Sequence, residues 1–264
     1  MKTGQEAVPG RLILGERGAY AEVNETRIYY ETHGAGHPLL LMHGGLETIE
    51  SLYPQADALA RHFQVILPER RGHGRTPDTP GPMGYLQGAR DMAALIRRLG
   101  ILRPHLVGYS DGAIVALFMG IHFADMVGKI VSIAGNYHYS GLSKRFAGKM
   151  RAMTLDEFKR SERQSVERYE RTSPDGPGHL SVVFEKVKRL WLTQPRLTAR
   201  DLARIAAPVL VIAADRDLIS PFHTVNLFRF LPNARLCIVP GATHSLVTEA
   251  SEEVNRAILR FLRE

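Results

Sequence analysis

Cysteine is nearly absent from this chain, which has only Cys237 in 264 residues. An intramolecular disulfide is therefore excluded, and no group of thiolates is available for a metal site. Cys237 lies in a short apolar run, so we expect its side chain to be buried and to have a packing role. The histidines and carboxylates also lack the spacing of a zinc site, and we predict neither a metal nor a cofactor.

Long hydrophobic runs are missing as well. No segment reaches the roughly 18 apolar residues of a membrane-spanning helix. Residues 1–17 hold no apolar stretch of signal-peptide length. We therefore expect a cytoplasmic protein with no membrane partner.

Charge of one sign is in moderate excess, but it is not concentrated. Lys and Arg outnumber Asp and Glu by 34 to 27, a net charge of +7, which would suit an anionic partner. The densest basic run, residues 144–171, also carries Asp156, Glu157, Glu162, Glu167 and Glu170. Because no recognition motif accompanies the charge, we predict no nucleic-acid partner.

Strand-like and helical patterns alternate along most of the chain, which indicates the α/β class with a mostly parallel central sheet and helices on both faces. Apolar or alternating runs predict strands at residues 20–23, 27–32, 39–42, 63–67, 104–109, 129–134, 208–213 and 235–239. Apolar residues at helical spacing predict helices at 85–99, 111–122, 221–230 and 249–263.

The alternation stops in residues 136–204. This segment is charged, has helical patterns and is broken by the turn-forming residues 172–178. We predict a core domain formed by residues 11–135 and 205–264, with residues 136–204 inserted as a helical lid.

The strongest local signal is the G-x-S-x-G pattern of residues 108–112, which lies directly between a predicted strand and a predicted helix. A sharp turn there would expose the Ser110 hydroxyl, and Gly108 and Gly112 would leave room for the tight backbone. The hydroxyl would also lie at a helix N-terminus, which favours the negative charge formed in acyl transfer. The alternative is an ordinary helix cap. We predict that Ser110 is a nucleophile.

A serine nucleophile needs a base within hydrogen-bond reach and a third group that orients the base. Among the 11 histidines, His244 lies in a loop just beyond the last predicted strand, where a parallel sheet exposes functional groups. Asp215 and Asp217 follow the preceding predicted strand. Only one of the two can face the histidine if this segment stays extended.

Acyl transfer also requires hydrogen-bond donors aimed at the developing oxyanion. The backbone N–H of Asp111, next to the nucleophile, is one donor by position. Residues 43–46 follow an apolar strand, and their glycines let the backbone approach a substrate closely. We predict that the N–H of Gly45 is the second donor and that His43 and Gly44 support it. A merely flexible turn is the alternative.

These motifs together resemble the α/β-hydrolase superfamily over nearly the whole chain outside the predicted lid. Five segments carry the resemblance in the expected order: residues 43–45 (H-G-x loop), 71–76 (R-G-x-G-x-S/T), 108–112 (nucleophile elbow), 217–221 (D-x-x-x-P) and 240–244 (histidine loop). The resemblance implies an α/β-hydrolase fold and selects Asp217 over Asp215 as the acid.

Some positions depart from the superfamily pattern. Glu69 stands where an aspartate is usual, with an extra Arg70 after it, and Ala113 replaces a common third glycine. Asp111 after the nucleophile resembles the biphenyl-hydrolase-like and valacyclovirase-like branch. A serine at position 110 argues against haloalkane dehalogenases and epoxide hydrolases, which use aspartate as nucleophile.

We therefore predict a serine hydrolase that cleaves a carboxylic ester of a small or medium acyl substrate through an acyl-enzyme. The alternatives on this fold are a lactonase, an amidase or aminopeptidase, a cofactor-free perhydrolase and a non-catalytic receptor for a small ligand. A small-molecule pocket is usually lined by apolar side chains, for which the candidates are Leu46, Tyr137, Met150, Phe184 and Trp191.

A histidine base must be neutral to accept a proton. The kcat/KM for an ester should therefore rise with pH through one limb near the ordinary imidazole pKa of about 6.5. The measurement is the pH profile of hydrolysis of a nitrophenyl ester, and added chelator should leave it unchanged. A rate that stays constant well below this limb would contradict a histidine base.

Overall fold

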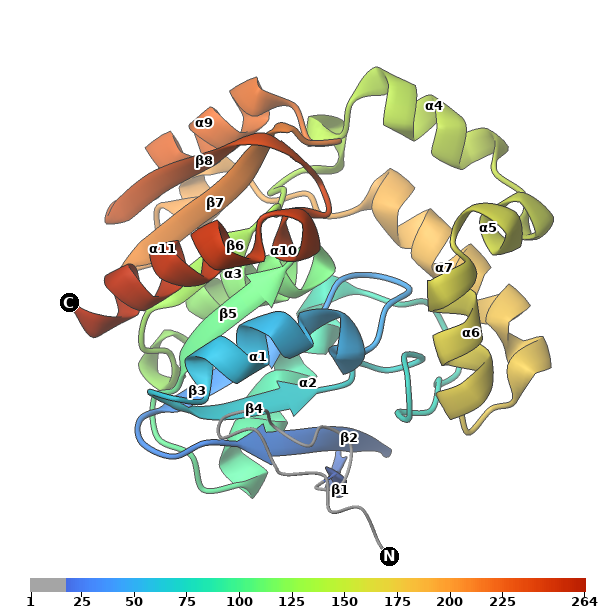
Figure 1. Ribbon diagram of the computed structural model, residues 1–264, viewed down its shortest axis with the longest axis horizontal. Coiled ribbons are helices and arrows are strands. Elements are labelled where there is room, and N and C mark those ends of the chain that lie inside the picture. The colour runs from blue at the N-terminus through green and yellow to red at the C-terminus, as the bar shows by residue number, and fades with distance from the viewer. Residues whose placement is uncertain (1–17) are drawn as a thin grey trace, which may run out of the picture.

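The computed structural model describes residues 18–264, which fold around an eight-stranded sheet (Figure 1). The strands lie in the order β1-β2-β4-β3-β5-β6-β7-β8, with the bounds β1 Gly18–Val23, β2 Thr26–His33, β3 Pro38–Met42, β4 Gln64–Pro68, β5 His105–Tyr109, β6 Ile130–Ile133, β7 Val209–Arg216 and β8 Ala234–Thr243. Strand β2 pairs antiparallel with β1 and β4, and all pairs from β4 to β8 are parallel. The predicted α/β class is confirmed. Residues 1–17 lie outside the described residues. The expected lack of a signal peptide and the start of the predicted core both fall within residues 1–17.

Helices cover both faces of the sheet. One face packs against α2 (Tyr85–Arg98), α3 (Asp111–His122), α8 (Ala199–Leu202) and α9 (Pro221–Phe230). The other packs against α1 (Tyr53–Leu59), α10 (Leu246–Glu249) and α11 (Ser251–Arg263) (Figure 1). The central strands β3, β5 and β6 are buried almost throughout, since helices cover them on both sides. Short 3-10 turns occupy Ile49–Leu52, Ala124–Met126, Tyr139–Gly141 and Pro177–His179.

All the predicted strands and helices are present, and their differences from the prediction have local causes. Strands β7 and β8 run past their predicted ends because they continue to pair, through a bulge, as far as Arg216 and Thr243. The predicted helix 249–263 is α11, which begins two residues later than predicted because the short helix α10 ends at Glu249. Helix α1 was not predicted, because its seven residues are too few for a periodic pattern.

The expectation that Cys237 is buried is wrong in part. Its side chain is half-buried, because β8 is the edge strand of the sheet and its neighbour Ile238 is 44% exposed. Burial raises the pKa of the Cys237 thiol.

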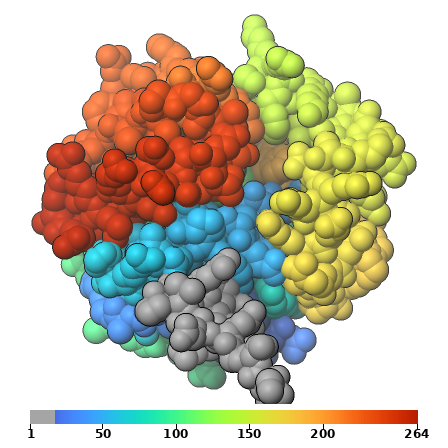
Figure 2. Space-filling model, viewed as in Figure 1, coloured from blue at the N-terminus to red at the C-terminus, as the bar shows by residue number. Residues whose placement is uncertain are grey.

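Residues 136–204 connect β6 to β7 and hold α4 (Lys144–Ala152), α5 (Leu155–Ser161), α6 (Arg163–Thr172), α7 (Leu180–Thr193) and α8. The Ser143 side chain caps α4, and Thr154 with Glu157 forms a capping box on α5. Helices α4 to α7 bury an apolar cluster of their own, which Leu46 of the core joins. They stand beyond the carboxyl ends of the parallel strands, and a furrow separates them from the core in Figure 2. Within residues 18–264 no helix is long and apolar enough to cross a membrane.

Candidate active site

Ser110 lies at the turn from β5 into α3, at the carboxyl edge of the sheet. Its backbone has φ +52° and ψ −116°, a strained conformation for a residue with a side chain. A Cβ on Gly108 would lie 2.2 Å from the carbonyl oxygen of Gly112, and one on Gly112 would lie 2.3 Å from that of Met42. The glycines therefore permit a turn tight enough to direct the Ser110 hydroxyl into a pocket.

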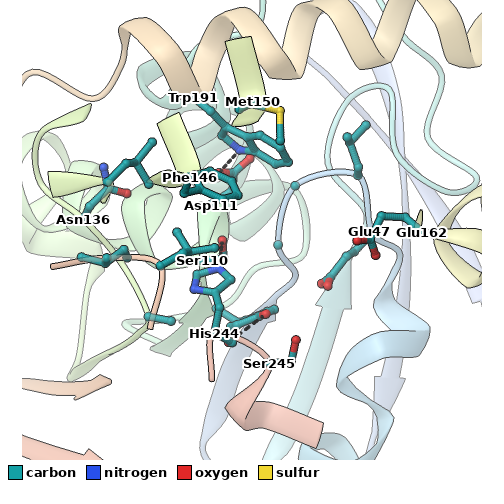
Figure 3. A pocket seen from close by; sticks show the side chains of 18 of the residues that line it. Glu47, Ser110, Asp111, Asn136, Phe146, Met150, Glu162, Trp191, His244 and Ser245 are labelled. Atoms are coloured by element: carbon teal, nitrogen blue, oxygen red, sulfur yellow. Dashed lines mark hydrogen bonds between the residues drawn. The ribbon is translucent and has the colours of Figure 1, made fainter. Parts of the chain in front are cut away.

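Two further loops at this edge bring an imidazole and a carboxylate to the serine. His244 follows β8, and its Nε2 lies 3.0 Å from Ser110 Oγ (Figure 3). Asp217 follows the neighbouring strand β7, and its Oδ1 lies 2.7 Å from His244 Nδ1. A carboxylate at Nδ1 assigns the proton to that nitrogen, so Nε2 is left to accept the hydroxyl proton of Ser110.

The two aspartates that the residue pattern alone did not separate have different partners. The side chain of Asp217 is 1% exposed, and its Oδ1 also accepts the N–H of Ile219 at 3.1 Å. Its Oδ2 is buried with no hydrogen-bond partner in the described part of the chain. The charge of Asp217 is therefore only partly compensated beside the imidazole. Asp215 is exposed and accepts the N–H of Gly241 at 2.8 Å, at the bulge between β7 and β8.

The two backbone N–H groups predicted to bind an oxyanion lie beside Ser110. Gly45 and Asp111 both line the pocket, and no acceptor among residues 18–264 takes the N–H of either. A Cβ on Gly45 would lie 2.6 Å from both Asp111 Oδ2 and the Trp191 ring, so a side chain does not fit there. Leu46 has φ +56° and turns the loop sharply after Gly45. Both N–H groups are thus available to an anionic oxygen at Ser110.

His43 links the glycine loop, residues 43–46, to the loop after β4. Its Nε2 accepts the backbone N–H of Arg70 at 3.1 Å, so Nδ1 carries the proton and donates to the carbonyl oxygen of Gly44 at 2.7 Å. Burial, and secondarily the charge of Arg70, holds the pKa of His43 well below its usual range. His43 is therefore a neutral bridge between two loops and does not reach the pocket.

The Asp111 carboxylate joins three parts of the molecule behind Ser110. It is 1% exposed, and its Oδ1 accepts hydrogen bonds from Trp191 Nε1 (Figure 3) and from Tyr85 Oη, both at 2.9 Å. Its Oδ2 accepts one from Arg70 Nη2 at 3.3 Å. These three partners were not predicted from the sequence. Arg70 departs from the superfamily pattern, and that departure was a signal of a changed polar network.

A cavity of about 240 Å³ opens over Ser110 between the core and the inserted helices. Of the predicted pocket residues, Leu46, Met150 and Trp191 line it. Other apolar lining residues were not predicted: Leu142, Phe146, Met153, Phe158, Leu218 and Ile219.

Two predicted pocket residues are wrong. Tyr137 stacks on His223, with ring centroids 3.9 Å apart, on the side of the segment that packs against the core. Phe184 is fully buried inside the cluster of inserted helices, where its ring lies 5.1 Å from that of Phe158. Helical periodicity identifies an apolar face, but it does not separate residues that face a neighbouring helix from those that face a cavity.

One side of the cavity is acidic, which was not predicted. Glu47 from the loop after β3 and Glu162 from the junction of α5 and α6 both line it (Figure 3). Burial raises the pKa of both carboxyl groups. Glu47 also accepts a hydrogen bond from Ser51 Oγ at 3.0 Å. Nowhere in residues 18–264 do three His, Cys, Asp or Glu side chains gather as a metal ion requires.

Comparisons with known proteins agree with this architecture. A family model described as the alpha/beta hydrolase family matches residues 32–257. A protein provisionally named carbamate hydrolase RutD, from Azorhizobium caulinodans, is 25% identical over 260 residues, which cover 93% of this chain and 98% of that protein. Serine hydrolase BPHL from Mus musculus is 25% identical over 256 residues, 93% of this chain and 86% of that protein. The crystal structure of the enol-lactonase from Burkholderia xenovorans LB400 superposes with a TM-score of 0.75 at 21% identity, covering 93% of this chain and all of that one (100%).

Buried and half-buried histidines should make the protein less stable in acid. Burial lowers the pKa of His73 to about 3 and the pKa values of His105 and His223 to about 4. In the unfolded chain these values return to about 6.5, so the unfolded state binds more protons below that pH. The free energy of unfolding should therefore fall as pH drops from about 6.5 to about 5, with about 1.5 kcal/mol from His73 alone. Urea denaturation across this range measures it.

The matched variants for this experiment are His73→Gln and His62→Gln. His73 is 2% exposed and His62 is exposed. The first substitution should flatten the pH dependence of unfolding and the second should leave it as in the wild type. Equal slopes in the two variants would contradict a buried, neutral His73.

Proposed function

Because the chain belongs to the alpha/beta hydrolase family, we propose that it is a serine hydrolase that cleaves a carboxylic ester of a small or medium acyl substrate. The observation that carries the proposal is the hydrogen-bonded chain from Asp217 through His244 to Ser110, with distances of 2.7 and 3.0 Å. The last group of this hydrogen-bonded series, Ser110, lines a cavity of about 240 Å³, which suits a small acyl group.

In the first half of the proposed reaction, His244 Nε2 takes the proton of Ser110 while Oγ attacks the carbonyl carbon of the ester. The N–H groups of Gly45 and Asp111 stabilise the oxyanion, and they need little reorganisation because no protein acceptor in the described residues competes for them. Asp217 accepts a hydrogen bond from the Nδ1–H of His244 and balances the positive charge of the imidazolium. His244 then protonates the departing alcohol, and the acyl group remains on Ser110.

In the second half, a water molecule replaces the alcohol. His244 takes a proton from the water as its oxygen attacks the acyl carbonyl, and the same two N–H groups bind the second oxyanion. Ser110 Oγ leaves and recovers its proton from His244. The products are a carboxylic acid and the original enzyme.

The strained backbone of Ser110 favours this function over a ligand receptor on the same fold. A φ of +52° costs free energy, and such strain persists mainly where it has a function. A receptor would have no need to hold a serine hydroxyl 3.0 Å from an oriented imidazole. A lactone is an internal ester, so lactonase activity would use the same steps and differ only in the shape of the pocket.

We further propose that residues 136–204 act as a lid that selects the acyl group. This segment supplies much of the apolar wall, including Phe146, Met150 and Trp191 (Figure 3). The hydrogen bond from Trp191 Nε1 to Asp111, at 2.9 Å, holds α7 in register with the serine.

Ser110→Ala, Asp217→Asn and His244→Ala should each lower kcat/KM for a nitrophenyl ester by about 10⁴-fold or more, because the three groups act as one unit. The double variants should lose little more than the single ones. A fluorophosphonate probe should label the wild type once, at Ser110, as located by peptide mass spectrometry.

The matched control for the acid is Asp215→Asn, since Asp215 contacts Gly241 and not His244. It should retain kcat/KM within about threefold, a change of less than 1 kcal/mol. A larger loss in Asp215→Asn than in Asp217→Asn, or labelling of a serine other than Ser110, would contradict the assignment.

Trimming the lid should change which acyl chain is preferred. Met150→Ala enlarges the cavity, so kcat/KM should shift toward longer acyl esters by about 1 kcal/mol or more per accommodated methylene. Phe184→Leu is the matched control, because Phe184 is buried in the same helices but does not line the cavity. It should lower the melting temperature and leave the preference unchanged. Parallel selectivity profiles in wild type and Met150→Ala would show that the lid does not select the acyl group.

A further inference from the structure

Arg70 is a buried cation that lies behind the wall of the pocket. It is 8% exposed, and its Nη2 donates to two acceptors, the Gly44 carbonyl oxygen at 2.9 Å and Asp111 Oδ2 at 3.3 Å. These acceptors belong to the two segments that carry the N–H groups of Gly45 and Asp111. A single guanidinium nitrogen therefore bridges both sides of the proposed oxyanion hole.

The contact with Gly44 controls the direction of a neighbouring donor. The carbonyl of Gly44 and the N–H of Gly45 belong to one planar peptide unit and point in opposite directions. Fixing the oxygen toward Arg70 therefore directs the N–H away from it, toward the pocket that Gly45 lines. A peptide between two glycines has unusual rotational freedom, so it needs such an anchor.

Arg70 acts on the same carbonyl by a second route. Its backbone N–H donates to His43 Nε2 at 3.1 Å, which leaves the proton of His43 on Nδ1. That Nδ1–H donates to the Gly44 oxygen at 2.7 Å. The Gly44 oxygen thus accepts one hydrogen bond directly from the side chain of Arg70. It accepts a second from His43 Nδ1–H, and the main chain of Arg70 sets the direction of that hydrogen bond.

The charge of Arg70 also strengthens the donor. Hydrogen bonds from a cation are stronger than neutral ones, and hydrogen bonds in series polarise one another. A cation at the Gly44 oxygen draws electron density from the peptide and makes the N–H of Gly45 more positive. Because Arg70 is buried, water screens this effect only weakly.

From these contacts we propose that Arg70 is a positioning residue for the oxyanion hole, which orients the Gly44–Gly45 peptide and ties it to the turn at Asp111. The proposal rests on the proposed hydrolase function, since it concerns the donors of that reaction. Arg70 itself touches no substrate. The competing explanation is that Arg70 only neutralises the buried carboxylate of Asp111, with which it forms an ion pair.

The first experiment compares Arg70→Met with Arg71→Met. Arg71 is the next residue, and it forms an ion pair with the buried Asp91, away from the glycine loop. For a nitrophenyl ester, Arg70→Met should lower kcat about 10- to 100-fold with KM changed less than about threefold, because a misdirected donor weakens the transition state more than substrate binding. Binding of a trifluoromethyl ketone, which forms an oxyanion on Ser110, should weaken by a similar factor. Arg71→Met should keep both values, and Arg70→Lys should recover part of the loss.

The double variant Arg70→Met/Asp111→Asn separates the two explanations and removes any unpaired buried charge that could prevent folding. If Arg70 positions the peptide, kcat of the double variant stays at least 10-fold below that of Asp111→Asn, a gap of about 1.4 kcal/mol. If Arg70 only neutralises Asp111, the double variant regains the kcat of Asp111→Asn, and the proposal is overturned. Equal losses in Arg70→Met and Arg71→Met would overturn it as well.

A readout without turnover keeps the proposal distinct from the function on which it rests. The amide signal of Gly45 in a ¹⁵N–¹H spectrum should shift or broaden in Arg70→Met and remain in place in Arg71→Met. An unchanged Gly45 signal in Arg70→Met overturns the positioning role even in an active enzyme. A wild type that hydrolyses no ester and reacts with no fluorophosphonate instead contradicts the proposed function alone.

Discussion

The buried carboxylate of Asp111 is the constraint on which the rest of the site depends. A carboxylate without water is costly unless donors surround it, and here Arg70, Tyr85 and Trp191 supply them. Each donor comes from a different part of the chain: the loop after β4, helix α2 and the inserted helix α7. The hydrogen bonds that satisfy the charge of Asp111 therefore fix the position of three segments around the nucleophile turn. Removal of any one of the three donors leaves the Asp111 carboxylate incompletely paired.

Most of the fold could be predicted from the sequence, because the alternation of apolar strands with periodic helices is a local property. Helix α3 begins and ends where its pattern predicts, and β3 is as buried as its apolar run indicates. The errors arose where partners decide the outcome. Strand β8 extends because β7 lies beside it, and Cys237 is half-exposed because β8 has no further neighbour.

The candidate site also contains residues that local motifs identify and residues whose role depends on partners elsewhere in the chain. Ser110 and His244 stand in short motifs that a reader of the sequence can find, whereas the residue pattern alone left Asp215 and Asp217 open. The walls of the pocket could not be read in this way, since Phe158 and Phe184 are equally apolar and only one lines the cavity. The role of Arg70 was hidden for a similar reason, because its acceptors Gly44 and Asp111 lie 26 and 41 residues away along the chain.

The hydrogen bond between Trp191 and Asp111 gives the protein an internal optical reporter. Trp191 is the single tryptophan of the chain, and its indole lines the cavity above Ser110. All the tryptophan emission of the protein therefore originates at the wall of the pocket, and its wavelength follows the polarity and hydrogen bonding of that wall. The position of helix α7 relative to the serine can be followed by light in the unmodified protein, with no attached label.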